Sequence, residues 1–372
     1  MRRLFAIAVE QCTSDVSLRH HLVRQLLDHS AAANGSATTM RWQLGAIDEP
    51  QFRWLMQSGL GPLLHHATRE QPDVPATWRA ALLGADLTAQ VRHGNQVDTA
   101  CEVIDLCTRG GIAVTLLKGI STSEELYPAA HLRPMGDIDL LVPPADCAGL
   151  ESALLQQGYR QAEWPENMPH HHAVPLHHPG HDVWVEIHTD LFPAYDALHA
   201  SGVFTRAHVG AHSIPSAFHQ RTVKRLTHEL QLVYVAASWM RDLTVLDIQP
   251  SFLPSLFDAL FLLRSAGRVL RWDTVLASLS DDMATACLHV MLTYIERHGW
   301  FEFPAPLLAH VAARQSIVGT VQTRAIHWML DRYLVGGRRW HFALPPPVPG
   351  RYSLRHQWRK RISGGRRQAG ID

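Results

Sequence analysis

The sequence lacks paired cysteines. Its five cysteines are Cys12, Cys101, Cys107, Cys147 and Cys287, and no two of them form a C-x-x-C pair. An odd number of scattered cysteines argues against a disulfide framework and against a cysteine-based zinc site. We therefore expect a reducing, cytoplasmic location.

Long apolar runs are also missing. No stretch reaches the roughly 18 uninterrupted apolar residues of a membrane-spanning helix. The chain begins with Arg2 and Arg3 followed by an apolar stretch, but Glu10 ends it after about six residues, below the roughly 7 to 15 of a signal-peptide core. We expect neither a signal peptide nor a transmembrane segment.

Charge of one sign is not in excess. The 34 basic residues balance 34 acidic ones, so no overall field attracts nucleic acid or an anionic membrane. The proline-rich and then basic tail, residues 341–372, is the local exception. It could form a nucleic-acid or membrane patch, but we interpret it as a solvated terminal segment, and nucleic acid is not an expected partner.

What is present is the composition of a globular protein, with 46% hydrophobic and 18% charged residues over 372 positions. Such a length predicts two or three domains. Leucines recur at helical spacing before Gly110-Gly111 and apolar residues do so again from about Arg221. We predict a helical N-terminal region at 1–110, a core at 111–210, a helical C-terminal domain at 211–340 and the tail at 341–372.

The predicted core alternates strands with helices. Apolar and β-branched runs predict strands at 112–117, 137–142 and 183–188. Helices are expected at 121–127, which Pro128 closes, and at 145–158, which Gly158 ends.

Two carboxylates at strand spacing are the most informative feature of this core. Successive side chains of a strand point to opposite faces, so Asp137 and Asp139 share one face. In the later strand Glu186 and His188 likewise share a face. Carboxylate oxygens are the ligands that hard divalent cations prefer, so the aspartate pair is a candidate metal site.

Several motifs of this core resemble those of a known family. They are Leu-Leu-Lys-Gly at 116–119, Leu-Tyr-Pro at 126–128, Arg-Pro-Met-Gly-Asp-Ile-Asp-Leu-Leu-Val at 133–142, Gly-Tyr at 158–159 and Val-Glu-Ile-His at 185–188. Together they resemble the polymerase-β-type nucleotidyltransferase fold and, more narrowly, the uncharacterised nucleotidyltransferase family of bacterial proteins. The resemblance covers 112–192 and continues weakly through 258–273. It implies an α+β fold, in which a small mixed sheet with helices is flanked by N-terminal and C-terminal helical regions.

The resemblance also implies a reaction, the transfer of a nucleoside monophosphate from a nucleoside triphosphate, expected to be ATP, to an acceptor hydroxyl. Asp137, Asp139 and Glu186 would be the catalytic carboxylates and would hold two Mg²⁺ (or Mn²⁺) ions. The acceptor would be a small molecule, a peptide or a protein, and the motifs identify neither it nor an oligomeric state. The alternative is a nucleotide-binding or scaffold protein that retains the fold without turnover.

Four further residues are the expected phosphate ligands: Lys118, Gly119, Ser121 and Arg133. The chain departs here from the superfamily, whose turn carries Gly-Gly or Gly-Ser, because Lys118-Gly119-Ile120-Ser121 stands in its place. Lys118 and Arg133 could each supply positive charge to a phosphate or form a salt bridge with a carboxylate.

Histidine is abundant, with 25 residues, and several crowd the segment from His170 to His181. A transition-metal site is the alternative there, but no H-E-x-x-H motif is present and prolines make the segment a loop. We interpret it as a solvated loop near the site. His172 is expected to line the acceptor pocket, and His188 to touch substrate or to orient the metal-binding acids. No nucleophile motif of a serine hydrolase or cysteine protease occurs.

Overall fold

The structure is a computed structural model that describes residues 16–28, 47–163, 171–245, 248, 250–266 and 269–337. The predictions for the first ten residues, for Cys12, for His170 and for the tail at 341–372 lie outside these residues. None of the helices in the described part of the chain is both long enough and apolar enough to cross a membrane.

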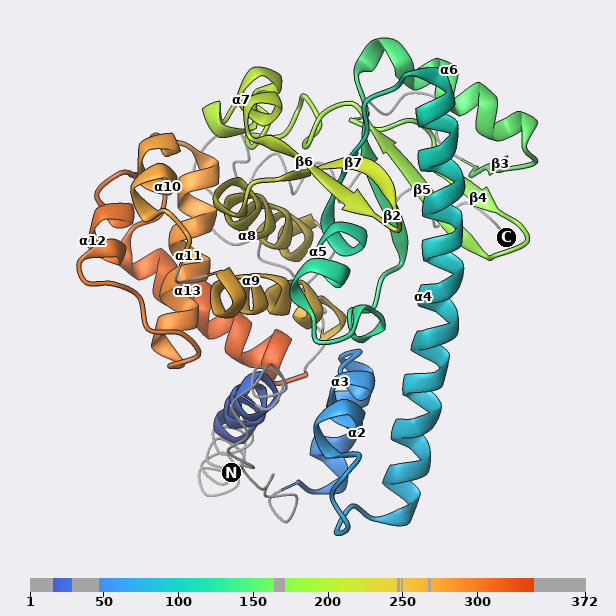
Figure 1. Cartoon of the computed structure of the whole chain (residues 1–372). Helices are drawn as coiled ribbons and strands as arrows, with labels where there is room; N and C mark the ends of the chain where they lie inside the picture. The colour runs from blue at the N-terminus through green and yellow to red at the C-terminus, as the bar shows by residue number, and fades with distance from the viewer. Residues whose placement is uncertain are drawn as a thin grey trace, which may run out of the picture.

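A seven-stranded mixed sheet forms the centre of the molecule, in the order β3-β4-β5-β2-β1-β7-β6 (Figure 1). The strands are β1 (Thr115–Leu116), β2 (Asp137–Leu141), β3 (Arg160–Gln161), β4 (Leu176–His178), β5 (Val183–His188), β6 (Ser213–Phe218) and β7 (Arg221–Leu226). The β2–β5 and β1–β7 pairs are parallel, and the other pairs are antiparallel. With the helices around it, this sheet confirms the predicted α+β class.

Helices precede the sheet, as the leucine spacing predicts. They are a helix over 16–28, α2 (Glu49–Gln57), α3 (Gly61–Thr68) and the long α4 (Ala76–Gly110). The α4 helix ends where the paired glycines predict, since Gly111 has the left-handed conformation at φ 67° and its N–H reaches the carbonyls of Cys107 and Thr108. Glycine is the residue that adopts this conformation without steric penalty.

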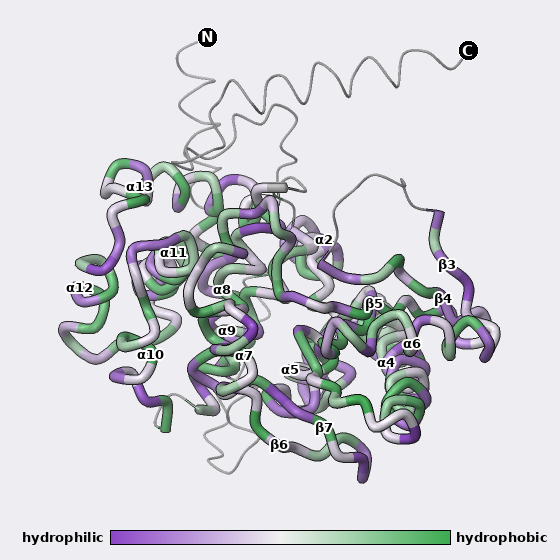
Figure 2. Tube along the Cα trace, turned by 90° about the horizontal axis from the view of Figure 1, so that it is seen from above, coloured by the Kyte–Doolittle hydropathy of each residue, from purple (hydrophilic) through white to green (hydrophobic). Residues whose placement is uncertain are grey.

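Within and after the sheet the remaining helices are shorter. They are α5 (Lys118–Leu126), η2 (Ala130–Leu132), α6 (Pro144–Gln156), η3 (Gly202–Phe204), α7 (Arg206–Ala211), α8 (His228–Val245), η4 (Pro250–Phe252), α9 (Leu253–Ala266), α10 (Trp272–Ser278), α11 (Met283–Arg297), α12 (Leu307–Ala312), α13 (Thr320–Met329) and the π-helix η5 (Leu330–Val335). In Figure 2 helices α8 to α13 gather on one side of the molecule, and α4, α6 and β3 to β5 on the other.

Three local predictions differ from the structure in their bounds. The strand expected at 112–117 is limited to the two residues of β1. The helix expected from Ser121 begins at Lys118, directly after Leu117. The helical periodicity expected from Arg221 begins at His228, because 221–226 form β7. Leu226 fits the spacing of the helix that follows, although it is the last residue of a strand that pairs with both β1 and β6. The sheet thus continues past residue 210, where the core was expected to end, and the domain division stays a prediction.

The sheet has an apolar face and a polar face at β2 and β5. Ile138, Leu140, Val185 and Ile187 belong to a buried cluster that includes residues of α4 and α6. Because strand residues alternate, this burial turns Asp137, Asp139, Glu186 and His188 to the other face. A slip of one residue would bury the carboxylates in the apolar core, so the pattern strongly specifies the register.

Candidate functional site

The candidate site lies where β2 and β5 run side by side in parallel. In their register Asp139 is opposite Glu186, and Asp137 is opposite Trp184. Neighbouring strands lie about 4.8 Å apart, so the Asp139 and Glu186 side chains stand next to each other on one face. Asp137 stands on the same face, two residues before Asp139. The structure thereby brings the three predicted carboxylates together.

Asp139 is the centre of a polar cluster. Its Oδ1 is 2.6 Å from Lys118 Nζ and 2.8 Å from His188 Nε2, and His188 Nε2 is also 3.4 Å from Glu186 Oε2. Asp139 is only 2% exposed and His188 is fully buried. A buried carboxylate needs such partners, because burial without them strongly disfavours its charge.

Lys118 reaches this cluster from the start of α5. Its backbone has φ 44°, in the left-handed region that few non-glycine residues adopt. The preceding Leu117 donates its N–H to the Asp139 carbonyl across the β1–β2 pair. The Lys118 side chain keeps 32% of its surface exposed, and its ammonium contacts Asp139.

Electrostatic repulsion acts between the two aspartates. The negative charge of Asp139, together with burial, raises the pKa of Asp137 to about 7, although Lys118 opposes this shift. Burial would also raise the pKa of Asp139, but the Lys118 ammonium and the His188 hydrogen bond outweigh it and hold that pKa below its usual range. A bound divalent cation would relieve the repulsion, since it favours the charged form of both carboxylates.

Lys118 and His188 carry the compensating positive charge. Burial disfavours the Lys118 ammonium, but the nearby Asp139 carboxylate raises the pKa of Lys118 well above its usual value. Burial likewise opposes protonation of His188, while hydrogen bonds to Asp139 and Glu186 raise its pKa. Both groups therefore neutralise the carboxylates they contact.

The donor set suits a divalent cation. Asp139, Glu186 and His188 each offer a ligand atom within 4.8 Å of the others, and Asp137 adds a carboxylate on the same face. Carboxylate oxygens are the ligands that Mg²⁺ prefers. Because His188 Nε2 already contacts Asp139 and Glu186, it is placed to orient these acids.

The histidine-rich segment contributes a separate group. Glu102, His178 and His181 also place ligand atoms within 4.8 Å of one another. Glu102 is exposed and belongs to α4, and the two imidazole rings stack at 4.3 Å. This group does not include the carboxylates of β2, so the sequence-based alternative of a transition-metal site would be a different site.

His172 lies beside His188 of the candidate site, and its role in an acceptor pocket stays a prediction. It forms an isolated antiparallel bridge with His188, and the centroids of the two rings are 5.2 Å apart. The neighbouring His171 ring is 4.9 Å from the His188 ring.

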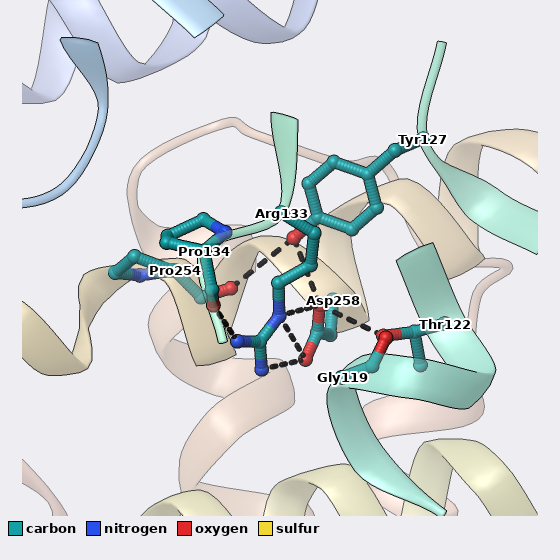
Figure 3. A network of polar contacts seen from close by, with 7 residues as sticks. All are labelled: Gly119, Thr122, Tyr127, Arg133, Pro134, Pro254 and Asp258. Atoms are coloured by element: carbon teal, nitrogen blue, oxygen red, sulfur yellow. Dashed lines mark hydrogen bonds and ion pairs between the residues drawn. The ribbon is translucent and has the colours of Figure 1, made fainter. Parts of the chain in front are cut away.

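Arg133 forms an ion pair with a buried carboxylate of the protein (Figure 3). Its Nη2 is 2.7 Å from Asp258 Oδ2 and its Nε is 3.0 Å from Asp258 Oδ1. Tyr127 Oη donates to Asp258 Oδ1 at 2.8 Å, and Thr122 also reaches this oxygen. The guanidinium group that could bind a phosphate therefore binds a carboxylate of α9. This ion pair connects the segment before β2 with the C-terminal helices.

Gly119 and Ser121 are buried in α5. A Cβ atom added at Gly119 would stand 2.5 Å from Met135 Cγ. Met135 can pack this closely because glycine has no side chain. Ser121 is 1% exposed, and its carbonyl accepts from Arg225. Phosphate contact by Gly119, Ser121 and Arg133 stays a prediction.

The charges of the site act on two residues of α8 that no sequence motif marks. Burial, with the charges of Asp139 and Glu186 adding to it, raises the pKa of Asp242. The Tyr234 ring is 1% exposed, and the charges of Lys118 and Asp139 both act on its hydroxyl. Their spacing of eight residues places both on one helix face, which is the one signal that the sequence offered.

Two proteins of known structure are similar to this chain at low sequence identity. The chain is similar to the antibiotic-resistance factor ANT(2'')-Ia, with 14% identity, a TM-score of 0.33, and coverage of 55% of this chain and 96% of that one. It is also similar to an antigenic nucleotidyltransferase-like protein from Paracoccidioides brasiliensis, with 12% identity, a TM-score of 0.36, and coverage of 59% and 93%. We assign no residue role and no substrate to this chain from either protein. No curated protein matches the chain.

The family comparison is more extensive. A model described as uncharacterised nucleotidyltransferase matches residues 47–298, from the segment before α2 to the end of α11. The matched range contains the whole sheet and the polar cluster around Asp139. By this match, the chain belongs to the uncharacterised nucleotidyltransferase family.

Proposed function

We propose that the protein is a magnesium-dependent enzyme that transfers a nucleoside monophosphate from a nucleoside triphosphate, ATP in the first instance, to a hydroxyl group of a small-molecule, peptide or protein acceptor. The single observation that carries the proposal is the parallel register that places Asp139 opposite Glu186, with Asp137 on the same face. Three carboxylates on one sheet face are a donor set for hard cations.

Each residue of the cluster has a role in this proposal. Asp137, Asp139 and Glu186 would hold the magnesium ions, which supply the positive charge that stabilises phosphate oxygens during transfer. Lys118 Nζ, 2.6 Å from Asp139 Oδ1 on a partly exposed side chain, would exchange this contact for a phosphate oxygen. His188 would hold Asp139 and Glu186 in place through its Nε2.

The binding experiment is a titration of the full chain with ATP, with and without magnesium. We expect a component of ATP binding that requires magnesium, and Asp139→Asn should weaken this component at least about tenfold, because the amide cannot replace a charged ligand. Asp98→Asn, on an exposed position of α4, is the matched control and should bind as the wild type does. Unchanged magnesium-dependent binding in an Asp137→Asn, Asp139→Asn double variant would show that the site assignment is wrong.

Turnover and the acceptor are tested together. Cell extract is incubated with the protein, magnesium and α-labelled ATP, and mass spectrometry identifies any metabolite or polypeptide that gains a nucleotide mass. Pyrophosphate release should accompany the gain and should fall by about 100-fold or more in Asp139→Asn, as expected for loss of an electrostatic group that stabilises the transition state.

A second function has one observation in its favour. The Lys118 ammonium already neutralises Asp139 at 2.6 Å, so this carboxylate has a positive partner without a metal ion. A nucleotide-binding protein without turnover would retain this ion pair. Magnesium-independent ATP binding that Lys118→Ala abolishes, without pyrophosphate release, would identify that function instead.

We also propose a cytoplasmic location. The described cysteines Cys101, Cys107, Cys147 and Cys287 are all free thiols, as expected in a reducing compartment.

A further inference from the structure

A second candidate ligand site lies away from the sheet. A pocket of about 580 Å³ is lined by the N-terminal helix over 16–28, by the end of α11, and by the junction of α13 with η5. None of its lining residues belongs to a strand or to α5. Its volume is in the range of about 300 to 1,000 Å³ that small-molecule sites occupy.

Positive charge dominates this pocket. Arg24, Arg297 and Arg332 line it, and among its described lining residues Asp331 is the one carboxylate. The charge of that carboxylate is already engaged: its Oδ1 accepts from Tyr294 Oη at 3.0 Å and lies 3.0 Å from His20 Nε2, and its Oδ2 is 3.3 Å from Arg297 Nη2. An anion that enters the pocket therefore meets an excess of guanidinium groups.

A flat aromatic surface stands beside these arginines. Trp328 lines the pocket and is 53% exposed, although it is a large apolar side chain. The Arg332 guanidinium lies 5.5 Å from the centroid of its ring. Exposed tryptophan next to arginine is the combination on which nucleic-acid bases stack, whereas arginine forks match phosphate oxygens.

We propose that this pocket binds a nucleoside phosphate, with the base on Trp328 and the phosphates on Arg24, Arg297 and Arg332. An inorganic phosphate would contact the arginines but not the tryptophan. An uncharged nucleoside would stack on the tryptophan but leave the arginines without an anion. The proposal goes beyond the transfer reaction, because it gives the protein a second nucleotide site that shares no residue with the carboxylate cluster.

The test is calorimetric titration of the full chain with ATP in EDTA, which removes divalent cations and so weakens binding at the proposed catalytic site. We expect one ATP site. The double variant Arg24→Gln, Arg332→Gln should bind ATP at least tenfold more weakly, and Trp328→Ala should also weaken ATP binding. Arg314→Gln changes an exposed arginine of the C-terminal helical region outside the pocket and should leave binding unchanged.

Two comparisons separate the sources of binding. Inorganic tripolyphosphate and adenosine should each bind at least tenfold more weakly than ATP, because each engages half of the pocket. Asp139→Asn should leave the binding in EDTA intact, so failure here is distinct from failure of the proposed transfer reaction. The inference is overturned if ATP does not bind in EDTA, if the arginine double variant binds it like the wild type, if tripolyphosphate binds as tightly as ATP, or if Asp139→Asn abolishes the binding.

Discussion

At the scale of single residues, a buried histidine far from the sheet makes stability depend on pH. His327 in α13 is 5% exposed, and its Nε2 lies 3.1 Å from the Val290 carbonyl oxygen. Burial lowers its pKa to about 4 from an ordinary value of 6.5. The folded protein therefore disfavours the imidazolium.

The sign of the effect follows from this lowered pKa. Between pH 6.5 and 4 the unfolded chain binds more protons than the folded one, so the contribution of His327 to stability is complete above pH 6.5 and is lost as the pH falls toward 4. At about 1.4 kcal/mol per pKa unit, the loss is on the order of 3 kcal/mol. Urea unfolding across this range should show a shallower loss for His327→Gln than for wild type, whereas exposed His310→Gln should follow wild type. Parallel curves for all three proteins would refute the prediction.

Gly119 permits a close contact that any other residue would disturb. A Cβ atom there would stand 2.5 Å from Met135 Cγ and 2.7 Å from Met135 Sδ. We expect Gly119→Ala to destabilise the fold by about 1–3 kcal/mol through overpacking. In a double-mutant cycle with Met135→Ala the two effects should be less than additive, and full additivity would show that the contact is not the cause.

At the residue scale, then, the structure brings the three predicted carboxylates together, and it gives two of the predicted phosphate ligands carboxylate partners. The sequence left open whether Lys118 contacts a phosphate or a carboxylate, and in the structure its ammonium contacts Asp139. The same alternative was open for Arg133, and the structure pairs it with Asp258, whose position 125 residues later no local pattern reveals. Asp242 was missed because its approach to the site depends on how α8 packs.

At the scale of elements, the Arg133–Asp258 pair connects the segment before β2 with α9. Both side chains are largely buried, with 12% and 3% of their surfaces exposed. Arg133→Met would leave the Asp258 carboxylate buried without its charge partner, so we expect a loss of about 3–5 kcal/mol in the free energy of unfolding. Denaturant titration measures this loss.

A surface pair with similar geometry is the control for that experiment. Arg206 grips Asp190 through two hydrogen bonds of 2.7 and 2.6 Å, but the Arg206 side chain is 62% exposed. Solvent screens such a pair, so Arg206→Met should cost at most about 1 kcal/mol. Equal losses for the two variants would show that burial does not decide the strength of the Arg133 pair.

The accuracy of the element predictions followed the strength of the local signal. The bounds of β5 agree with the alternating pattern of 183–188, and β2 agrees within one residue. In contrast, β7 was assigned to a helical region, because Leu226 also fits the spacing of the helix after it. A short strand is identified by its neighbours in the sheet, and those neighbours are distant in sequence.

At the scale of the whole molecule, the N-terminal helix over 16–28 is part of the main core. Leu22, Val23, Leu26 and Leu27 are fully buried. Trp300 Nε1 donates to the His20 carbonyl, and Arg19 Nη1 donates to the Val335 carbonyl, so contacts reach from this helix to the end of the described chain. The two ends of the described chain therefore stabilise each other.

Truncation of one leucine tests this arrangement. Leu26→Ala should lower the free energy of unfolding by about 2–5 kcal/mol, because it leaves a cavity in the core. Leu87→Ala is the matched control on α4, where the side chain is 51% exposed, and it should change stability by at most about 0.5 kcal/mol. A neutral Leu26→Ala variant would show that the helix packs only loosely.

The sequence by itself determined the alternation of β2 and β5, and therefore that Asp137 shares a face with Asp139 and Glu186 with His188. This alternation depends on the period of a strand, which is local. The α+β class was implied by the resemblance of the core motifs to a known family. Only the tertiary structure decided that β2 and β5 are parallel neighbours in the register that sets Asp139 opposite Glu186. It also decided that Asp258 pairs with the Arg133 guanidinium. Finally, it decided that the N-terminal helix meets α11 and η5 around an arginine-lined pocket. The physical reason is that pairing and burial depend on which distant surfaces pack together, and no local period records that choice.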